Sequence, residues 1–242
     1  MWLGQARTPE GMRLYAIGDV HGCDDLLAEA HDKIARDLES RPAADYRIIH
    51  VGDYSDRGPD TAAVIERLIG LVTADARVVC LRGNHDELLV GFLNDPNRIG
   101  PTFLANGGDA TLASYGVKLG VMAMLLGDPA KLSARLAERM PVSDRAFLQA
   151  LPLTARFGDY LFCHAGIRPG VPLERQEPDD LTWIRDEFLL SGVDHGFVVV
   201  HGHTPASEPE VLPNRINIDT GAVFTGRLTC LALEGTDYDF LE

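Results

Sequence analysis

The first third of the chain alternates short apolar runs with longer amphipathic stretches. The apolar runs predict strands over residues 13–17, 48–51 and 77–81. Between them, apolar residues recur at helical spacing over residues 24–38 and 61–72, which predicts two helices. This strand–loop–helix order is typical of an α/β layer built on parallel strands.

The pattern becomes helical from about residue 87. Three helical stretches follow, covering residues 87–93, 130–140 and 143–150. Turn-forming Asn, Pro and Gly residues interrupt this region at 95–97 and 106–108. Because strand signals are few here, we predict a helical insertion or cap over about residues 87–151 rather than a separate domain.

Strand signals return in the last third of the chain. Four apolar runs carry them, at residues 160–163, 197–200, 215–218 and 228–233. Only a short helical stretch near residues 181–190 lies between them, so we predict a second, more mixed sheet. The whole chain, residues 1–242, is then one α/β domain with two sheets and a helical insertion.

Composition narrows the class of protein. The chain has 242 residues, 45% of them hydrophobic and 24% charged, with a formal net charge of −14. Such acidity argues against nucleic acid as a partner, because nucleic-acid binding depends on clustered Lys and Arg, and it gives no reason to expect a membrane partner. No apolar run approaches the ~20 residues that a membrane helix needs, and we expect a cytoplasmic protein.

The four cysteines are predicted to be reduced thiols in or near the core. They are widely separated and form no Cys-x-x-Cys pair, at positions Cys23, Cys80, Cys163 and Cys230. A thiolate zinc site and a disulfide framework are therefore not expected.

Side chains able to bind metals follow five of the predicted strands. They are Asp19, His21, Asp53, Asn84, His164 and His203. Any one of them alone is more often a hydrogen-bonded loop residue. Together they indicate a metal site, and six ligands exceed the three or four that one catalytic ion takes from protein. We therefore expect two ions that share Asp53 and lie ~3.5–4 Å apart, a pair able to acidify a bridging water and to neutralise a phosphoryl group.

The runs that carry these residues resemble a known family. Three of them are Gly18-Asp19-Val20-His21-Gly22, Gly52-Asp53-Tyr54-Ser55-Asp56-Arg57-Gly58 and Gly83-Asn84-His85-Asp86, and two later ones are His164-Ala165-Gly166 and Gly202-His203-Thr204-Pro205. They are similar, in this order, to the motifs of the phosphoprotein phosphatase (PPP) family of calcineurin-like metallophosphoesterases. The resemblance spans residues 14 to about 233 and implies a four-layer αββα sandwich with a dinuclear site at the strand tips.

The resemblance also implies roles for single residues. One metal would be held by Asp19, His21 and Asp53, and the other by Asp53, Asn84, His164 and His203. A hydroxide that bridges the ions would attack phosphorus. The catalytic residues would be His85 as general acid, Asp56 as the carboxylate that orients it, and Arg57 and Arg185 as phosphate-binding guanidinium groups. For Arg185, a charge on a surface helix is an equally good interpretation.

Family variants leave the substrate open between two classes. The run from Asn106-Gly107-Gly108 to Ser114-Tyr115-Gly116 looks like bacterial Ser/Thr protein phosphatases, which favours a phosphomonoesterase of Ser/Thr or dual specificity. Asp86 replaces a common Glu and is usual in symmetrical diadenosine tetraphosphatases, the alternative. Pro205 stands where many nucleases of the wider family have another metal-binding His.

A third hypothesis is an inactive metal-binding scaffold. The intact His85 and Asp56 speak against it, since a scaffold needs no general acid. By resemblance the two ions would be Mn²⁺, while Fe, Zn, Co or Mg also suit such ligands. The partner would be a phosphoprotein or a phosphorylated small molecule, with oligomeric state left open. The remaining histidines, His31, His50, His195 and His201, are predicted to be structural or supporting.

Overall fold

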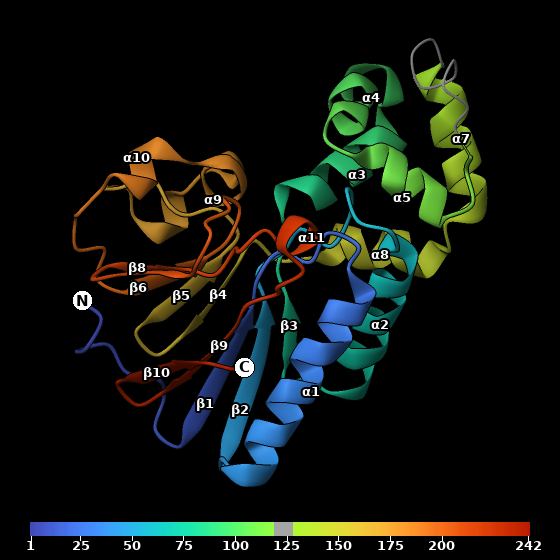
Figure 1. Cartoon of the computed structure of the whole chain (residues 1–242). Coiled ribbons are helices and arrows are strands. Elements are labelled where there is room, and N and C mark those ends of the chain that lie inside the picture. Colours follow the sequence, from blue (N-terminus) through green and yellow to red (C-terminus); the bar gives the residue numbers. More distant parts are fainter. Residues whose placement is uncertain (119–127) are drawn as a thin grey trace.

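Two five-stranded sheets pack face to face between layers of helices (Figure 1). The computed structural model describes residues 1–118 and 128–242. The first sheet has the strand order β10-β9-β1-β2-β3, and the second has the order β4-β5-β6-β8-β7. The predicted αββα sandwich is confirmed.

Parallel strands and two long helices form the half of the molecule that contains the first sheet. Its elements are β1 (Met12–Ile17), α1 (Asp24–Ser40), β2 (Asp45–His50), α2 (Thr61–Ala74), β3 (Val78–Cys80), β9 (Cys230–Glu234) and β10 (Asp237–Phe240). β1, β2 and β3 are parallel, β9 pairs antiparallel with β1, and β10 pairs antiparallel with β9 at the edge of the sheet. The parallel strands leave their carboxyl ends together at one edge, where the loops that carry the predicted site begin.

The second sheet has shorter strands and shorter helices. Its elements are β4 (Thr154–Phe157), β5 (Tyr160–Cys163), a 3₁₀ turn η1 (Leu173–Arg175), α9 (Pro178–Trp183), α10 (Asp186–Leu189), β6 (Val198–His201), β7 (Glu210–Leu212), β8 (Arg215–Asn217) and α11 (Ala222–Thr225). β5, β6 and β8 are parallel, while β4 and β7 are antiparallel edge strands. This is the mixed sheet that the sequence predicts.

Successive side chains of each strand point to opposite faces of its sheet and so fill two different parts of the core. In β1, Leu14 and Ala16 belong to the cluster between the two sheets, while Tyr15 and Ile17 join the cluster under α1 and α2. In β5, Phe162 faces the inter-sheet cluster and Leu161 faces α9 and α10. Strands buried on both faces read as continuous apolar runs, which is why the sequence reveals them.

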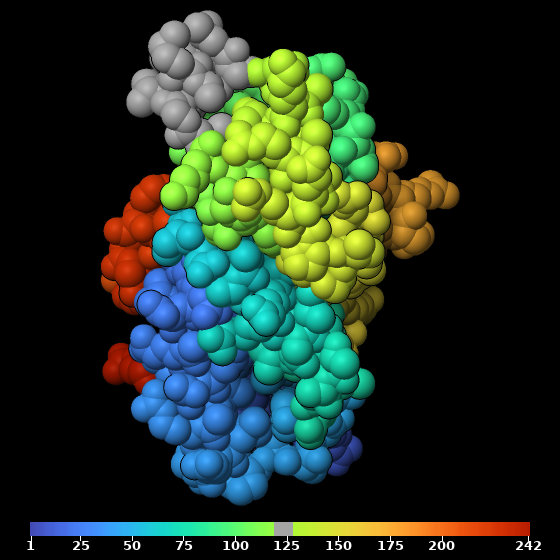
Figure 2. Space-filling view, turned by 90° about the vertical axis from the view of Figure 1, so that its right-hand side faces the viewer, coloured from blue at the N-terminus to red at the C-terminus, as the bar shows by residue number. Residues whose placement is uncertain are grey.

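The helical insertion covers one end of the first sheet's helix layer. It contains α3 (Asn84–Asn94), α4 (Pro96–Ala105), α5 (Gly108–Ser114), α7 (Pro129–Arg139) and α8 (Val142–Ala150). Figure 2 shows these helices above α1 and α2 on the same face of the molecule. Residues 119–127 of the predicted insertion lie outside the described residues.

The structure corrects three details of the prediction. The run at 228–233 is predicted in the second sheet, but it forms β9, which pairs with β1 in the first sheet. The reason is packing: Leu231 and Leu233 fill the space between the two sheets, while Cys230 and Ala232 belong to the cluster under α1 and α2. Strands β4, β7 and β10 were missed, since each is a short edge strand of three or four residues. The turn signals at 95–97 and 106–108 do mark breaks between helices, but the helix between them, α4, was not predicted; Pro96 opens it at its first turn.

In the described parts of the chain, no helix has both the length and the apolar character needed to cross a bilayer.

Candidate metal centre

The six predicted metal ligands meet at the carboxyl ends of β1, β2, β3, β5 and β6. All of them are buried: Asp19, His21, Asp53, Asn84, His164 and His203. Asn84 is the first residue of α3 rather than part of a loop, so Asn84 and His85 are fixed by a helix N-terminus. Sequence reasoning placed the start of this helix at residue 87.

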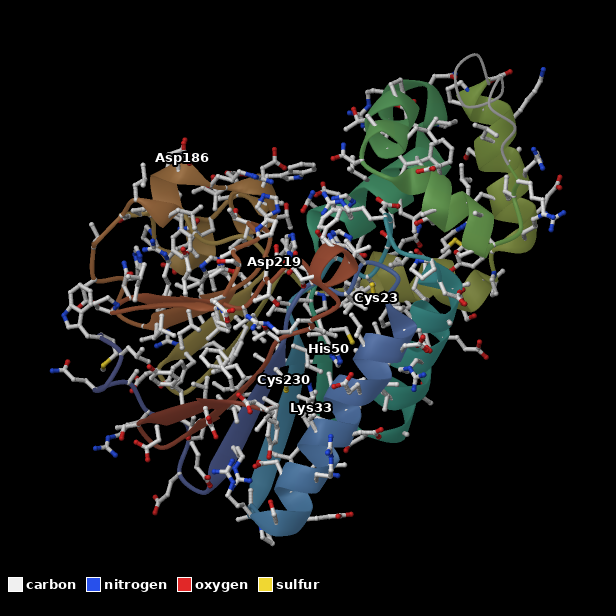
Figure 3. The ribbon with its side chains drawn as sticks, in the orientation of Figure 1. Cys23, Lys33, His50, Asp186, Asp219 and Cys230 are labelled. Carbon is white, nitrogen blue, oxygen red and sulfur yellow. The ribbon has the colours of Figure 1, made fainter. Side chains whose placement is uncertain are left out.

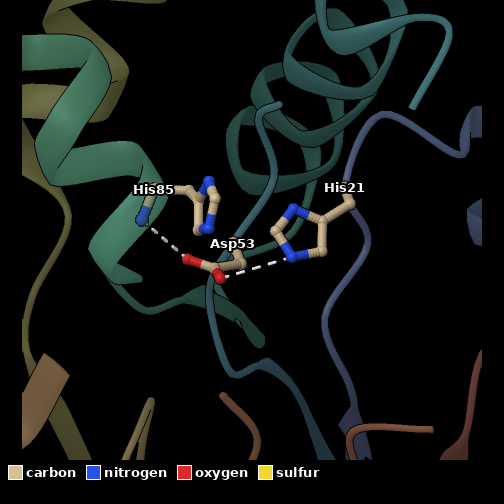
Figure 4. Close-up of side chains that lie close together, drawn as sticks. All are labelled: His21, Asp53 and His85. Carbon is tan, nitrogen blue, oxygen red and sulfur yellow. Dashed lines mark hydrogen bonds and ion pairs between the residues drawn. The ribbon is translucent and has the colours of Figure 1, made fainter. Parts of the chain in front are cut away.

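Asp53 lies at the middle of the cluster (Figure 4). Its Oδ2 is 3.5 Å from Nε2 of His21, and its Oδ1 is 3.4 Å from Nε2 of His164. The backbone N–H of His85 also donates to Oδ1, at 2.9 Å. Two groups of potential ligands, each within 4.8 Å, share this carboxylate: His21, Asp53 and His85 in one, and Asp19, Asp53 and His164 in the other. Asp53 therefore has the position expected of a ligand common to two ions.

The histidines present the nitrogen that a metal needs. Nδ1 of His21 lies 2.8 Å from the carbonyl of Ser55, and Nδ1 of His164 lies 3.0 Å from the carbonyl of Val51. Donation from Nδ1–H to a carbonyl leaves Nε2 as the lone-pair nitrogen, the usual arrangement of metal-ligating imidazoles. Burial lowers the pKa of His21 to about 4, so its ring is neutral at pH 7.

Asn84 joins the remaining two histidines. Its Oδ1 lies 2.8 Å from Nε2 of His164 and 2.9 Å from Nδ1 of His203. Burial, reinforced by the neighbouring His164, lowers the pKa of His203 to about 3. One carbonyl oxygen and two neutral imidazoles thus converge, a donor set that suits divalent transition metals.

A buried excess of carboxylate shows that the residues fit cations. Asp19, Asp53 and Asp219 are all buried, and Oδ1 of Asp19 has no hydrogen-bond partner among the described residues. Burial and then the nearby Asp219 and Asp53 raise the pKa of Asp19 well above its ordinary value. Clustered carboxylates removed from water are costly unless a cation compensates them. Asp219 follows the end of β8, so the rule that found the other strand-tip residues could also have found it.

His85 and Asp56 form a hydrogen-bonded pair beside this cluster. Nδ1 of His85 lies 2.8 Å from Oδ2 of Asp56. Burial opposes protonation of the ring, but the carboxylates of Asp53 and Asp56 outweigh it and raise the pKa of His85. The structure thus brings together the two groups that sequence reasoning paired as acid and orienting carboxylate.

Thr111 of α5 holds the other side of Asp56. Its hydroxyl donates to Oδ1 of Asp56 at 2.7 Å and accepts from the backbone N–H of Asp56 at 2.9 Å. The sequence analysis had used the run around Thr111 only to compare families. Its contact with Asp56, 55 positions away in sequence, depends on the tertiary fold.

Both predicted arginines reach the imidazoles. Arg57 donates through Nη1 to Nε2 of His21 at 2.8 Å and through Nη2 to Nε2 of His85 at 2.9 Å. Nε of Arg185 donates to Nε2 of His203 at 3.1 Å. Arg185 sits at the junction of α9 and α10, and although the residue is exposed, its guanidinium reaches the edge of the cluster through this bond to His203. Two guanidinium groups thus border the site, where they could grip a phosphoryl group.

Asp86 secures the backbone around Asp53. Its carboxylate accepts from the N–H groups of Gly83 and Asp53, both at 2.9 Å, and of Tyr54 at 3.0 Å. Burial and the neighbouring Asp53 raise the pKa of Asp86 to about 7. The sequence analysis singled out Asp86 as a substrate marker and missed this structural role.

The other histidines and the cysteines make none of these side-chain contacts, although the Cys23 thiol donates to the backbone carbonyl of His21 at 3.6 Å. Nε2 of His31 is 3.0 Å from Nε2 of His50, between α1 and β2, and His201 is buried at the end of β6. The four cysteines are free, and all except the half-buried Cys23 are buried, as predicted.

Comparison with known proteins agrees with this geometry. The family model described as "Calcineurin-like phosphoesterase" matches residues 12–226. A protein of Oceanobacillus iheyensis named bis(5'-nucleosyl)-tetraphosphatase PrpE (asymmetrical) is 30% identical over 236 residues, which cover 90% of this chain and 87% of the relative. A protein of the same name from Bacillus mycoides is 28% identical over 239 residues, 91% of this chain and 90% of the relative. A crystal structure described as "a putative diadenosine tetraphosphatase" superposes with a TM-score of 0.65 at 21% identity, over 97% of both chains.

Proposed function

The chain belongs to the calcineurin-like phosphoesterase family, and we propose that within it this hydrolase cleaves dinucleoside polyphosphates. The observation that carries the chemistry is the carboxylate of Asp53, shared by two ligand groups next to the His85–Asp56 pair. The proposal for the substrate rests on relatives that match about nine-tenths of the chain and are named as nucleosyl tetraphosphatases.

The family implies divalent metal ions, and Mn²⁺ is our proposal for them. Asp19, His21 and Asp53 would hold one ion, and Asp53, Asn84, His164 and His203 would hold the other. When bound, such ions lower the pKa of water and neutralise charge on a phosphoryl group.

The chain's own side chains then supply binding and proton transfer. Arg57 and Arg185 border the cluster and would hold the oxygens of the reacting phosphoryl group. During hydrolysis a water oxygen bonds to phosphorus and the bond to the leaving oxygen breaks. His85 would donate the proton that the leaving oxygen takes up, and Asp56 keeps the ring oriented for this step.

Dephosphorylation of phosphoserine or phosphothreonine is the second candidate function. The His85–Asp56 pair favours this function, because an alkoxide is a poor leaving group that needs a proton. A phosphate leaving group depends less on protonation. The two candidates therefore share one site and differ in which group leaves.

The purified, Mn²⁺-loaded protein should be given diadenosine tetraphosphate and a phosphoserine peptide in parallel. We expect the dinucleotide to be cleaved faster. ATP with AMP as products would indicate asymmetrical cleavage, and ADP alone would indicate the symmetrical cleavage that was the alternative in the sequence analysis. Cleavage of the peptide alone would overturn the proposal in favour of the second candidate.

A His85→Asn variant tests the catalytic role. General-acid catalysis contributes roughly 10²–10⁴-fold, so kcat should fall by that order on an alkyl phosphoester while metal content stays at the wild-type level. Unchanged kcat would remove His85 from this role. No hydrolysis of any phosphoester by metal-loaded wild type would support the inactive scaffold.

A further inference from the structure

Exposed aromatic rings border the loop that carries His203. Among the described residues, only three large aromatic side chains are markedly exposed: Trp183 at 37%, Phe224 at 72% and Tyr238 at 44%. Trp183 ends α9, and its ring lies 6.1 Å from that of His203. Water-exposed aromatic surface beside a reaction site is a recurrent means of holding a flat ligand ring.

Phe224 lies in a different element, whose start adjoins the same loop. It belongs to α11, the short helix that follows Asp219. A methyl group placed on Gly221 would lie 3.6 Å from both the Phe224 ring and the Pro205 side chain, so both groups adjoin Gly221. Figure 3 shows Asp219 at the strand tips beside α11, well apart from Asp186 on α10. The two aromatic positions thus belong to different parts of the molecule.

The surface next to Trp183 suits a nucleobase better than a further phosphate group. A hollow of about 400 Å³ is lined by Trp183, Ile184, Arg185, the Arg168–Asp180 ion pair and the exposed carboxylates of Asp179, Asp186 and Glu187. With Arg168 paired to Asp180, the three exposed carboxylates leave the hollow negative. Carboxylates repel phosphate but accept hydrogen bonds from exocyclic amino groups. Arg185 lies between this hollow and the ligand cluster, because it lines the hollow while its Nε donates to His203.

We propose that Trp183 and Phe224 are stacking platforms for the two nucleobases of the substrate, with an amino-bearing purine in the hollow beside Trp183. This inference rests on the proposed dinucleotide hydrolase activity and adds the residues that select for nucleosides. A phosphate chain held by Arg57 and Arg185 would link the two stacked bases. Aromatic stacking recognises any base, so discrimination among purines would come from the carboxylates.

Intrinsic fluorescence measures binding at Trp183 without any turnover. The chain contains two tryptophans, Trp2 and Trp183, so the Trp2→Phe variant reports on Trp183 alone. Titration with ATP should quench its fluorescence saturably, and titration with inorganic tripolyphosphate, which has no base, should not. The absence of quenching by ATP would overturn the proposal.

Kinetics of substituted proteins supply the second test. Trp183→Leu and Phe224→Leu keep an apolar side chain but remove the aromatic ring. For each, the ratio of kcat/KM on diadenosine tetraphosphate to kcat/KM on p-nitrophenyl phosphate should fall 10- to 100-fold, the size of one lost base–aromatic stack. Trp183→Phe should restore most of the ratio. Tyr238→Leu, on β10 at the edge of the first sheet, is the matched control and should leave the ratio unchanged.

These results separate this inference from the proposed function. Cleavage of the dinucleotide with unchanged ratios in both variants would refute the platforms and leave the function intact. Quenching by ATP in a protein that cleaves only the phosphopeptide would refute the function and keep a nucleotide site at Trp183.

Discussion

The hydroxyl of Thr111 offers a sharp test of how the helical insertion serves the site. Replacing Thr111 by Val keeps the shape of the side chain and removes both hydrogen bonds to Asp56, at 2.7 and 2.9 Å. The backbone N–H of Asp56 would be left buried without a partner, which costs about 1–3 kcal/mol. The lost hydroxyl–carboxylate bond adds about 1.5–3 kcal/mol, since bonds to charged groups are the stronger ones. We expect a lower melting temperature in a protein that still folds.

The effect on catalysis should depend on the leaving group. With Asp56 less constrained, His85 loses part of its orientation, and we expect kcat to fall roughly 10- to 100-fold, within the range of general-acid catalysis. A phosphoester with an alkyl leaving group should suffer most, while 2,4-dinitrophenyl phosphate, whose leaving group needs no proton, should be nearly unaffected. Metal content should not change.

Two further variants serve as controls for this interpretation. Thr111→Ser restores the hydroxyl and should recover the alkyl substrate. Thr61→Val deletes the hydroxyl 3.1 Å from that of Thr111, but among the described residues the Thr61 side chain has no hydrogen bond to Asp56, so the change should cost stability with little leaving-group dependence. An equal loss on both substrates in Thr111→Val would refute the argument.

Two other predictions concern the backbone and pH. Gly107 has φ +93°, and a methyl group there would lie 2.8 Å from Cγ of Arg57, so Gly107→Ala should displace that arginine and lower kcat/KM at least tenfold. Gly170 has φ +78° but open space around it, so the control variant Gly170→Ala should cost only about 1 kcal/mol of stability. Equal kinetics in the two alanine variants would contradict this. Burial lowers the pKa of His31 to about 4 and the pKa of His50 to about 3, below the ordinary 6.5. Below pH 6.5 the unfolded chain therefore binds more protons at these two rings than the folded protein does. The free energy of unfolding should therefore decrease from pH 6.5 toward 4 by up to about 1.4 kcal/mol per pH unit for each ring, and urea unfolding of His31→Leu/His50→Leu should show a shallower slope than the wild type.

The parts of the fold that sequence reasoning recovered are those specified locally. Strands β1, β2, β5 and β6 each contain a run of apolar residues, and α1 and α2 repeat their apolar positions at helical spacing. The ligand cluster followed from the same rule, because polar residues directly after buried parallel strands must gather at one edge of a sheet.

The parts that it missed depend on contacts between distant segments. β9 reads like any other apolar strand, and only packing against β1, more than 200 positions earlier, decides which sheet it joins. Arg185 could have been a surface charge, and its hydrogen bond to His203 exists only because the α9–α10 junction lies over the end of β6. A charged residue near a turn carries no local signal for either outcome.

Backbone strain links the fold to the site. Within the described residues, five non-glycine residues have positive φ: His21, Asp53, Asp56, Arg57 and His203, all of them candidate ligands or catalytic groups. Such conformations cost of order 1 kcal/mol or more each and persist only where the surroundings impose them.

Side chains from other segments supply that constraint. Asp86 accepts the N–H of Asp53, the hydroxyl of Thr111 accepts that of Asp56, and Oδ2 of Asp19 accepts that of His203 at 3.0 Å. None of these partners is within 30 positions of the residue that it holds. The motifs therefore contain the reacting side chains and two of the residues that hold them, Asp19 and Asp86. The holding role becomes visible only in three dimensions, because each of these bonds goes to backbone that is remote in sequence.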